Sequence, residues 1–287
     1  MTNITILGTG AMGSRLAKKL LESNYAVTIF NRTKKHAMPL IDSGAKFFET
    51  AREAVIDADI IISMLTNDEA SKTVWLDNDT GAINGLKKGA IAIESSTLSK
   101  TWIDELATEF NSRGIEFLDA PVVGSKPQAE NAELIFLVGG SKESLDKSSP
   151  VLSKLSSSIL HIGPIGSGIK MKLAVNAFFG VQVSALSELI GLMEQTGIEK
   201  EKTVDFFNRL PTTSPALQGI GKMIAANNFS PLFPINLIEK DFRYILDMAS
   251  LSQSQLPVIK ATHNVFTTAI EANYGEDNVA GVAKLYL

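Results

Sequence analysis

A glycine-rich turn between two apolar runs is the feature of this sequence that most limits its fold. The first run is Ile4–Leu7, an amphipathic stretch follows the turn, and the second run, Ala26–Phe30, ends at Asn31. A strand, a G-x-G-x-x-G turn, a helix and a second strand form the βαβ unit that binds dinucleotides. Its glycines allow the tight turn, the approach of a pyrophosphate to bare backbone, and close packing of helix on strand. The residues predicted to bind the cofactor here are Gly8, Thr9, Gly10, Ala11, Met12 and Gly13.

The residues after the second apolar run indicate which dinucleotide binds. An acidic residue in this place would bind the ribose 2′-hydroxyl of NAD, whereas the chain has Asn31-Arg32-Thr33 and then two lysines. A guanidinium with amide and hydroxyl donors beside it would instead bind a 2′-phosphate through charge-assisted hydrogen bonds. We therefore predict that Asn31, Arg32 and Thr33 contact NADP. The alternative is that these charges only form a solvated surface.

The composition argues against several other classes of protein. The chain has 287 residues, of which 45% are hydrophobic and 20% charged, a formal net charge of −4 and no cysteine. The acidic balance argues against a nucleic-acid partner, and the lack of cysteine excludes disulfides and thiolate chemistry. His36, His161 and His263 have no metal-ligand spacing, so we expect no metal. The short first apolar run has no basic flank like that of a signal peptide, so we expect a cytoplasmic protein.

The order of the predicted elements defines the fold class. Up to residue 162, short β-type runs alternate with helical segments, and continuous apolar runs such as Asp59–Met64 are typical of strands covered on both faces. This alternation predicts an α/β fold, a doubly wound Rossmann-type sheet with parallel crossovers. We also expect helices at Lys34–Ser43, which Pro39 would shorten or kink, and at Ala51–Ala58.

The composition changes after residue 162. A glycine-rich joint, Gly163–Gly168, leads into a long apolar segment up to Gly197, after which β-type runs are absent. We therefore predict an NADP-binding Rossmann-like domain at 1–162 and an all-helical domain for substrate binding and dimerisation at 163–287, joined by a long helix. This helix is long enough to cross a membrane. However, Asn176, Gln182 and Glu188 interrupt it, and polar groups are costly in lipid. A helix that is apolar nearly all round is typical of one buried inside the protein or in a subunit interface. We favour an inter-domain helix in the core of a homodimer or homotetramer and expect no membrane, and burial within a single subunit would explain the pattern equally well.

Two polar side chains stand near the start of the long apolar segment. Lys172 and Asn176 are four residues apart, so on a helix they share a face. An ammonium and an amide on an otherwise apolar helix, just after a joint between domains, indicate a binding site. Lysines in a first helical turn are usually solvated, so the spacing alone leaves both interpretations open.

The chain resembles the β-hydroxyacid dehydrogenase family, which includes 3-hydroxyisobutyrate dehydrogenases and glyoxylate/succinic semialdehyde reductases, nearly end to end. The resemblance rests on the glycine-rich turn, Asp119-Ala120-Pro121-Val122, Gly166-x-Gly168-x-x-x-Lys172-x-x-x-Asn176, Glu188, Phe233 and Lys240-Asp241. It implies that Lys172 is catalytic, with Asn176 as its hydrogen-bonding partner. It also implies cofactor contacts from Met64, Leu65, Thr97 and Lys240.

One loop departs from the family pattern. The substrate loop of the family usually reads Pro-Val-Ser-Gly-Gly and holds a substrate carboxylate, whereas this chain has Pro121-Val122-Val123-Gly124-Ser125. Val123 removes a hydroxyl, Ser125 supplies one two positions later, and backbone donors at Gly124 and Ser125 are expected to be available. The predicted substrate-binding residues are therefore Val123, Gly124 and Ser125, together with Lys172 and Asn176.

These features predict an NADPH-dependent reduction of a small aldehyde acid, of the glyoxylate or succinic semialdehyde type, to the hydroxy acid. The Lys172 ammonium would stabilise the charge that grows on the carbonyl oxygen and would deliver the proton. In the oxidative direction this lysine must be neutral, and burial would lower its pKa. The alternatives are an imine reductase-like enzyme, which the loss of the loop serine favours, and a non-catalytic NADP(H)-binding sensor. The presence of Lys172 argues against both.

Overall fold

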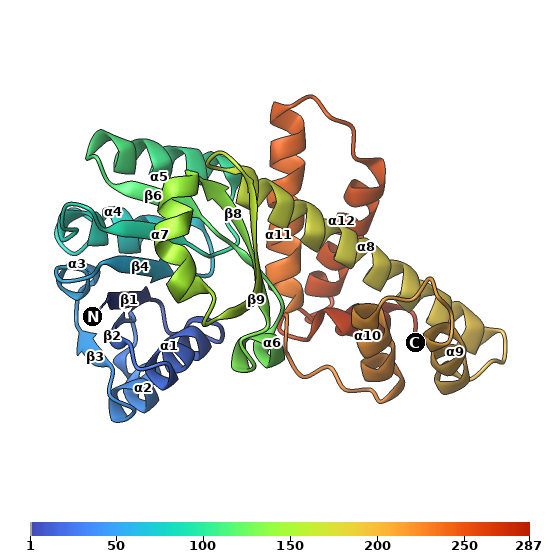
Figure 1. Cartoon of the computed structure of the whole chain (residues 1–287). Helices are drawn as coiled ribbons and strands as arrows, with labels where there is room; N and C mark the ends of the chain where they lie inside the picture. Colours follow the sequence, from blue (N-terminus) through green and yellow to red (C-terminus); the bar gives the residue numbers. More distant parts are fainter. Residues whose placement is uncertain (1) are drawn as a thin grey trace. The chain divides into compact units, whose positions relative to one another are not determined.

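The computed structural model describes residues 2–287, which form two compact units (Figure 1). The first unit ends at Lys172 and the second begins at Leu173. This division falls inside one long helix, α8 (Ser167–Gln195). The boundary predicted after residue 162 lies at the end of the strand that precedes this helix.

The first unit is built on one sheet. In residues 2–287 its strands lie in the order β3-β2-β1-β4-β5-β6-β8-β7, and β9 pairs with β8. The strands from β3 to β6 are parallel to their neighbours, whereas β8 runs antiparallel to β6 and β7. The strands are β1 (Asn3–Leu7), β2 (Ala26–Phe30), β3 (Lys46–Phe48), β4 (Ile60–Ser63), β5 (Ile91–Glu94), β6 (Glu116–Asp119), β7 (Val122–Val123), β8 (Leu134–Gly140) and β9 (Ser156–Gly163).

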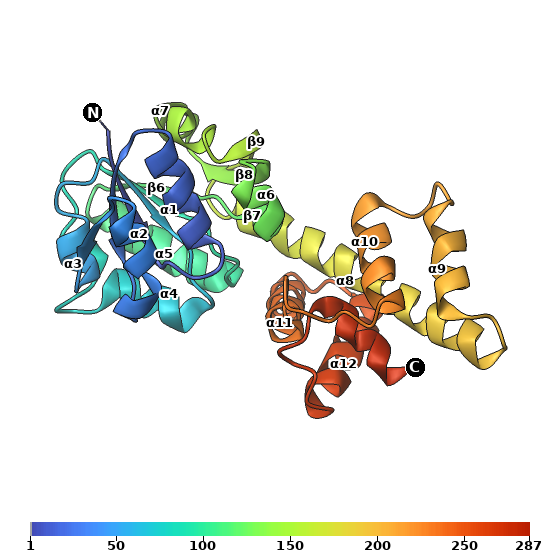
Figure 2. The ribbon, with the colours of Figure 1, turned by 90° about the horizontal axis from the view of Figure 1, so that it is seen from below.

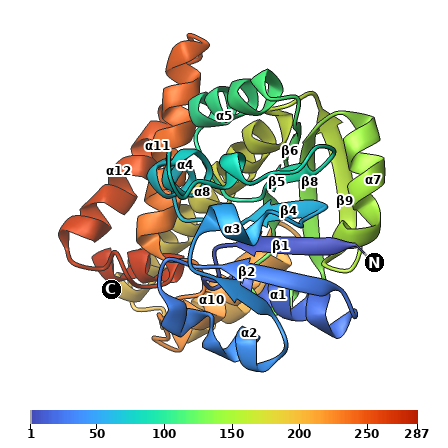
Figure 3. The ribbon, with the colours of Figure 1, turned by 90° about the vertical axis from the view of Figure 1, so that its left-hand side faces the viewer.

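Helices cover both faces of this sheet. Figure 3 shows α1 and α2 on one side of the strands and α4 and α5 on the other. Every residue of β4 and β5 is buried, as expected for strands enclosed by two layers of helices. The helical elements are α1 (Gly13–Glu22), η1 (Lys34–His36), α2 (Met38–Asp42), α3 (Ala51–Ala54), α4 (Asp68–Leu76), η2 (Ala82–Asn84), α5 (Lys100–Ser112), α6 (Lys126–Glu130) and α7 (Lys142–Leu152).

The strand order places the glycine-rich turn at the end of β1, the strand at which the order of the sheet reverses. From β1 the chain moves to β2 and β3 on one side, and then returns to the other side of β1 for β4. Leu7, the last residue of β1, is level with Phe30 in β2 and with Ser63 in β4. The loops after β1, β2 and β4 therefore leave the same edge of the sheet, at a topological switch point where ligands bind in such folds.

The second unit is helical. Its elements are the greater part of α8, then α9 (Lys200–Asn208), α10 (Pro215–Ala225), α11 (Ile235–Leu251), α12 (Pro257–Glu271) and the 3₁₀ helix η3 (Val279–Leu285). Figure 1 shows α11 beside α12, and Figure 2 shows α9 beside α10. Gly180 allows α8 to pack closely on α11, because a Cβ at this position would lie 2.4 Å from the Phe242 ring. The predicted fold class, a Rossmann-type sheet followed by helices, is confirmed.

The details of three predicted elements differ from the structure. Pro39 does not kink a helix over Lys34–Ser43; it lies in the first turn of α2, where its missing N–H is not needed, after the separate η1. The helix predicted over Ala51–Ala58 ends at Ala54, because the backbone turns there to enter β4. The expectation of parallel crossovers fails at β8, which pairs antiparallel with both β6 and β7, whereas β9, which follows through α7, pairs parallel with β8.

In residues 2–287, α8 is also the one helix that is long and apolar enough, by length and composition, to cross a membrane. Half of its most apolar stretch is buried inside the protein. Core helices of globular proteins have the same character.

Candidate cofactor and catalytic site

The three glycines of the turn after β1 have different structural roles. Gly8 has a φ of +94°, and a Cβ there would lie 2.5 Å from the Met64 carbonyl oxygen. A Cβ at Gly13 would lie 1.9 Å from the Gly8 carbonyl oxygen. A Cβ at Gly10, in contrast, would meet no atom within 4 Å. Packing therefore requires Gly8 and Gly13, whereas Gly10 leaves open space beside bare backbone.

The backbone around Gly10 has the donors that a pyrophosphate needs. Within residues 2–287 the backbone N–H groups of Ala11 and Met12 donate no hydrogen bond. Met12 is the N-cap of α1 and provides no side-chain cap. Unsatisfied N–H groups and the positive end of the helix dipole together suit an anion. The turn thus suits the phosphates of a dinucleotide.

Asn31 joins the glycine-rich turn to the end of β2. Its Oδ1 accepts a hydrogen bond of 2.9 Å from the Thr9 backbone N–H, and its Nδ2 donates one of 2.9 Å to the Thr33 carbonyl. The exposed Arg32 makes no hydrogen bond or ion pair within residues 2–287. The ammonium of Lys34 is paired with Glu49 at 2.8 Å. Arg32 is thus an available cation at the end of β2, beside an asparagine that shapes the turn.

The loops after β4 and β5 are also joined. The Leu65 backbone N–H donates a hydrogen bond of 2.7 Å to the Ser96 Oγ. Met64 packs against the glycine-rich turn through its carbonyl, and Thr97 follows Ser96 directly. The structure therefore brings Met64, Leu65 and Thr97 to one edge of the sheet, although their contacts with a cofactor stay a prediction.

Asp119, the last residue of β6, holds the start of α8. Its buried carboxylate accepts hydrogen bonds from the backbone N–H groups of Gly166 (2.7 Å) and Ile169 (2.8 Å). Burial raises the pKa of Asp119 to about 6, and these hydrogen bonds only partly oppose that effect. A carboxylate in this position caps the helix and interacts favourably with its dipole.

The predicted substrate loop has fewer free donors than the sequence indicated. Val123 pairs with Ile135 across β7 and β8, and Gly124 is exposed with a φ of +123°. The Ser125 backbone N–H donates to the Gln128 Oε1 at 2.9 Å, because Ser125 and Gln128 begin α6 as a capping box. The expectation that this backbone donor is available for a carboxylate was therefore wrong.

Lys172 and Asn176 are both buried on α8, with exposed fractions of 8% and 6%. In the second unit, the Asn176 Nδ2 donates a hydrogen bond of 2.6 Å to Oδ2 of Asp241, which is 2% exposed. The other carboxylate oxygen of Asp241 lies 3.0 Å from the Lys240 Nζ, an ion pair without hydrogen-bond geometry. Lys240 also lies over the Tyr244 ring, 4.9 Å from its centroid. Asp241 therefore fixes the amide of Asn176 and partly balances the charge of Lys240.

Sequence reasoning missed the roles of three carboxylates. Asp119 and Glu94 each end an apolar strand at the edge where ligands bind, and this position was a usable signal. Asp241 is next to Lys240 on an amphipathic helix, and no local pattern reveals that it contacts Asn176. In residues 2–287 no group of three or more potential metal-binding side chains is present.

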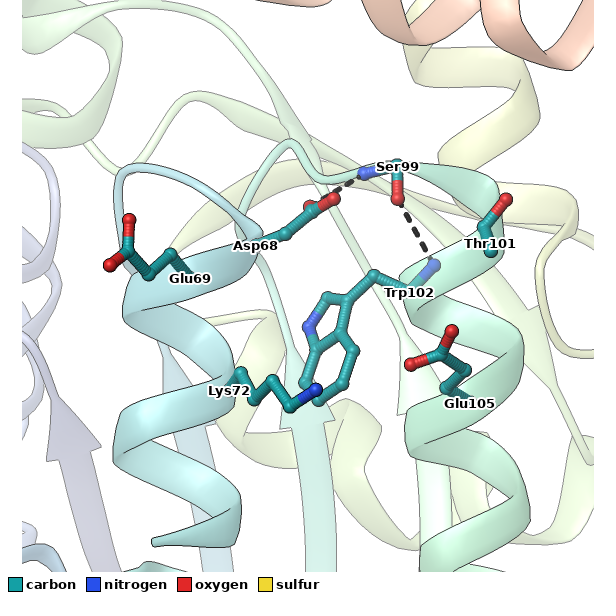
Figure 4. Close-up of a pocket in the computed structure, with 7 residues that line it drawn as sticks. All are labelled: Asp68, Glu69, Lys72, Ser99, Thr101, Trp102 and Glu105. Carbon is teal, nitrogen blue, oxygen red and sulfur yellow. Dashed lines mark hydrogen bonds between the residues drawn. The ribbon is translucent and has the colours of Figure 1, made fainter.

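A surface hollow between α4 and α5 is separate from these residues. Figure 4 shows the side chains that line it, with the Ser99 backbone N–H donating to Asp68 and the Trp102 backbone N–H donating to the Ser99 Oγ. Its lining consists of Asp68, Glu69, Lys72, Ser99, Thr101, Trp102 and Glu105. None of the predicted site residues lies in it.

Comparison with known proteins agrees with the fold. Residues 3–163 match the model of the NAD binding domain of 6-phosphogluconate dehydrogenase, and residues 166–286 match that of the NAD-binding domain of NADP-dependent 3-hydroxyisobutyrate dehydrogenase. The chain is 31% identical to an uncharacterized oxidoreductase, YfjR, of Bacillus subtilis, over 98% of both chains. It is 29% identical to the chloroplastic glyoxylate/succinic semialdehyde reductase 2 of Arabidopsis thaliana, over 98% of this chain and 78% of that one. The structure of the Mycobacterium tuberculosis 3-hydroxyisobutyrate dehydrogenase with L-serine matches with a TM-score of 0.89 and 27% identity, over 99% of both chains.

The fold, the glycine-rich turn and these matches define an oxidoreductase that uses a nicotinamide cofactor. The chain belongs to the 3-hydroxyisobutyrate dehydrogenase-like branch of the β-hydroxyacid dehydrogenase family. The resemblance inferred from the sequence is thus confirmed, and the family supports an NAD(P)-dependent hydroxyacid dehydrogenase or reductase activity.

Proposed function

We propose that the protein uses NADPH to reduce a small aldehyde acid, of the glyoxylate or succinic semialdehyde type, to the hydroxy acid. The observation that carries this proposal is the buried pair Lys172 and Asn176 on α8, in a chain similar to a glyoxylate/succinic semialdehyde reductase. A buried ammonium followed four residues later on the same helix by a buried amide suits a reaction in which negative charge grows on a carbonyl oxygen.

The bound cofactor would supply the hydride to the carbonyl carbon. Lys172 would donate a proton to the carbonyl oxygen as charge develops there, which general-acid catalysis makes worth about 10²–10⁴ in rate. Asn176 would orient the substrate oxygen without adding charge, and Asp241 would keep the Asn176 amide in one orientation through the 2.6 Å hydrogen bond. Lys240, paired with the same carboxylate, would contact the cofactor.

Two features support NADP over NAD. Arg32 has no partner within residues 2–287, and no carboxylate takes the place at the end of β2 that would bind a ribose 2′-hydroxyl. Gly8, Thr9, Gly10, Ala11, Met12 and Gly13 would hold the pyrophosphate, and Met64, Leu65 and Thr97 would lie along the rest of the cofactor.

The proposed binding of the substrate carboxylate depends on the loop after β7. Val123 provides no hydroxyl and the Ser125 backbone N–H is occupied, so Gly124 and the Ser125 side chain would carry the contact. The half-buried Lys126 begins α6 directly after this loop and adds a positive charge that suits an anionic substrate.

We also propose that residues 1–162 bind NADP and that residues 163–287 bind substrate and form a homodimer or homotetramer in the cytoplasm. Large apolar side chains on α8 support the association: Phe178, Leu189 and Leu192 are 69%, 42% and 50% exposed. Light scattering after size-exclusion chromatography tests the oligomeric state, and a monomer at micromolar concentration would contradict it.

A substrate screen with both cofactors tests the reaction. NADPH and NADH oxidation would be followed with glyoxylate, succinic semialdehyde, methylglyoxal and a cyclic imine. We expect the highest kcat/KM with NADPH and one of the two aldehyde acids. A preference for the imine would point to the imine reductase alternative that the absence of a loop serine at Val123 allows. Tight NADPH binding with no turnover would indicate a sensor.

A further inference from the structure

Glu94 is a buried carboxylate that the proposed chemistry does not use. It is the last residue of β5, is 0% exposed and accepts four hydrogen bonds. Its Oε1 accepts from the backbone N–H (3.0 Å) and the hydroxyl of Ser96. Its Oε2 accepts from the Ser71 Oγ (2.8 Å) and the Trp75 Nε1 (2.9 Å). A buried carboxylate is costly unless such donors surround it, so this set of bonds requires one well-defined geometry.

The bonds of Glu94 extend to two loops at the edge of the sheet. The Ser96 hydroxyl, which donates to Glu94, also accepts the 2.7 Å hydrogen bond from the Leu65 backbone N–H. On the other side, the Trp102 Nε1 donates to the Ser71 Oγ at 2.9 Å, which links α5 to α4. Figure 4 shows the Trp102 indole on α5, facing α4. One carboxylate thus connects both helices to the loops after β4 and β5.

We propose that Glu94 is a positioning residue for the nicotinamide cofactor. It fixes Ser96 and, through the Ser96 hydroxyl, the backbone at Leu65. The segments that contain Leu65 and Thr97 are then held in one conformation before the cofactor arrives, and preorganisation of this kind increases affinity. This inference rests on the proposed cofactor contacts of Leu65 and Thr97.

Ser96→Ala is the sharpest test, because it breaks the link between Glu94 and Leu65 and leaves the other donors to Glu94 in place. We expect the Kd for NADPH to rise about tenfold, since the Leu65 N–H loses its acceptor. Ser95→Ala is the matched control: the neighbouring Ser95 Oγ is buried and has no hydrogen-bond partner within residues 2–287. The Kd of Ser95→Ala for NADPH should stay within twofold of that of the wild type.

Glu94→Gln tests the carboxylate itself. The amide nitrogen of a glutamine would face either the Ser96 N–H or the Trp75 N–H, and neither can accept a hydrogen bond. We expect weaker NADPH binding and faster hydrogen exchange at residues 64–67 and 95–99. The two tryptophans of the chain both belong to this network. The emission maximum of the cofactor-free protein should therefore change in Glu94→Gln and stay unchanged in Ser96→Ala.

If Glu94→Gln fails to fold, Ser96→Ala carries the test. The proposal is overturned if folded Ser96→Ala binds NADPH within twofold of the wild type, or if Ser95→Ala is weakened equally. None of these measurements uses an aldehyde. A wild type that binds NADPH but reduces no substrate would therefore contradict the proposed function and leave this test valid.

Discussion

The Asp119 carboxylate at the end of β6 and the Ile169 backbone N–H in the first turn of α8 are joined by a hydrogen bond of 2.8 Å. The strand that leads into the substrate loop and the helix that carries Lys172 are therefore held at one point. The packing there is tight: a Cβ at Gly139 would lie 2.3 Å from one carboxylate oxygen of Asp119, and a Cβ at Gly168 would lie 2.9 Å from the other. Lys172 follows Ile169 by less than one helical turn, so its position depends on this contact.

Asp119→Asn is therefore expected to impair catalysis more than cofactor binding. An asparagine has one acceptor oxygen, so either the Gly166 or the Ile169 N–H loses its partner and the start of α8 can shift. We expect kcat to fall about tenfold or more, since small misplacements of a catalytic group have effects of this size. The Kd for NADPH should stay nearly unchanged. Glu116→Gln is the control on the same strand, because Glu116 pairs with Lys147 at the surface. A kcat of Asp119→Asn within twofold of the wild type would contradict this role.

The raised pKa of Asp119 also predicts how stability depends on pH. Its pKa is about 6 in the folded protein and about 3.8 in the unfolded chain, mainly because burial disfavours the charged form. The unfolded state therefore releases the proton first, and the folded protein loses up to about 3 kcal/mol as the pH rises from about 4 through 6. Because Asp119→Asn cannot titrate, the stability of the wild type relative to this variant should fall across that range. Urea unfolding of both proteins at pH 4.5 and pH 7 measures this change in relative stability. If the difference in unfolding free energy between the two proteins is the same at both pH values, the raised pKa of Asp119 is contradicted.

The glycines of the turn after β1 should separate folding from cofactor binding. Gly10→Ala adds a methyl group into open space, so the melting temperature of the cofactor-free protein should change little. NADPH binding should weaken by at least tenfold, because the methyl group occupies the approach to the backbone. Gly13→Ala places a Cβ 1.9 Å from the Gly8 carbonyl oxygen and should lower the melting temperature itself. Equal NADPH binding by Gly10→Ala and the wild type would show that the pyrophosphate lies elsewhere.

Arg32 should determine the choice of cofactor. Arg32→Ala removes a cation that has no partner within residues 2–287, so KM for NADPH should rise about tenfold or more while KM for NADH changes little. Lys34→Ala is the matched control, because Lys34 is paired with Glu49 and stacks on the Phe47 ring. Its effect on either KM should be less than threefold. A wild type with equal or higher kcat/KM for NADH would refute the preference for NADP.

The sequence alone predicted most of the fold because its signals are local. The glycine-rich turn, the continuous apolar runs of β4 and β5 and the long apolar α8 are each patterns formed by residues that are close together in sequence. The short elements were less accurate. At α3 a capping contact from Thr50 begins a helix that ends after one turn, and at β8 the antiparallel pairing depends on partners far along the chain.

The candidate site was predictable only in part for the same reason. The positions of Gly8, Lys172 and Asn176 follow from motifs, but the contacts that hold them join residues far apart in sequence. The Asp119–Ile169 and Asn176–Asp241 hydrogen bonds span 50 and 65 residues. The capping of α6 that occupies the Ser125 N–H is local, and the Ser-x-x-Gln pattern at 125–128 was a signal that could have been used.

The central claim is that Lys172 delivers the proton in an NADPH-dependent reduction, and the single-turnover rate of Lys172→Met with bound NADPH tests it most directly. Lys170→Met is the matched control, because Lys170 is exposed on the same turn of α8. We predict that Lys172→Met binds NADPH as the wild type does, while its rate of NADPH oxidation by the best aldehyde acid falls by about 10²–10⁴. Lys170→Met should react at the wild-type rate. A Lys172→Met rate within threefold of the wild type would contradict the account.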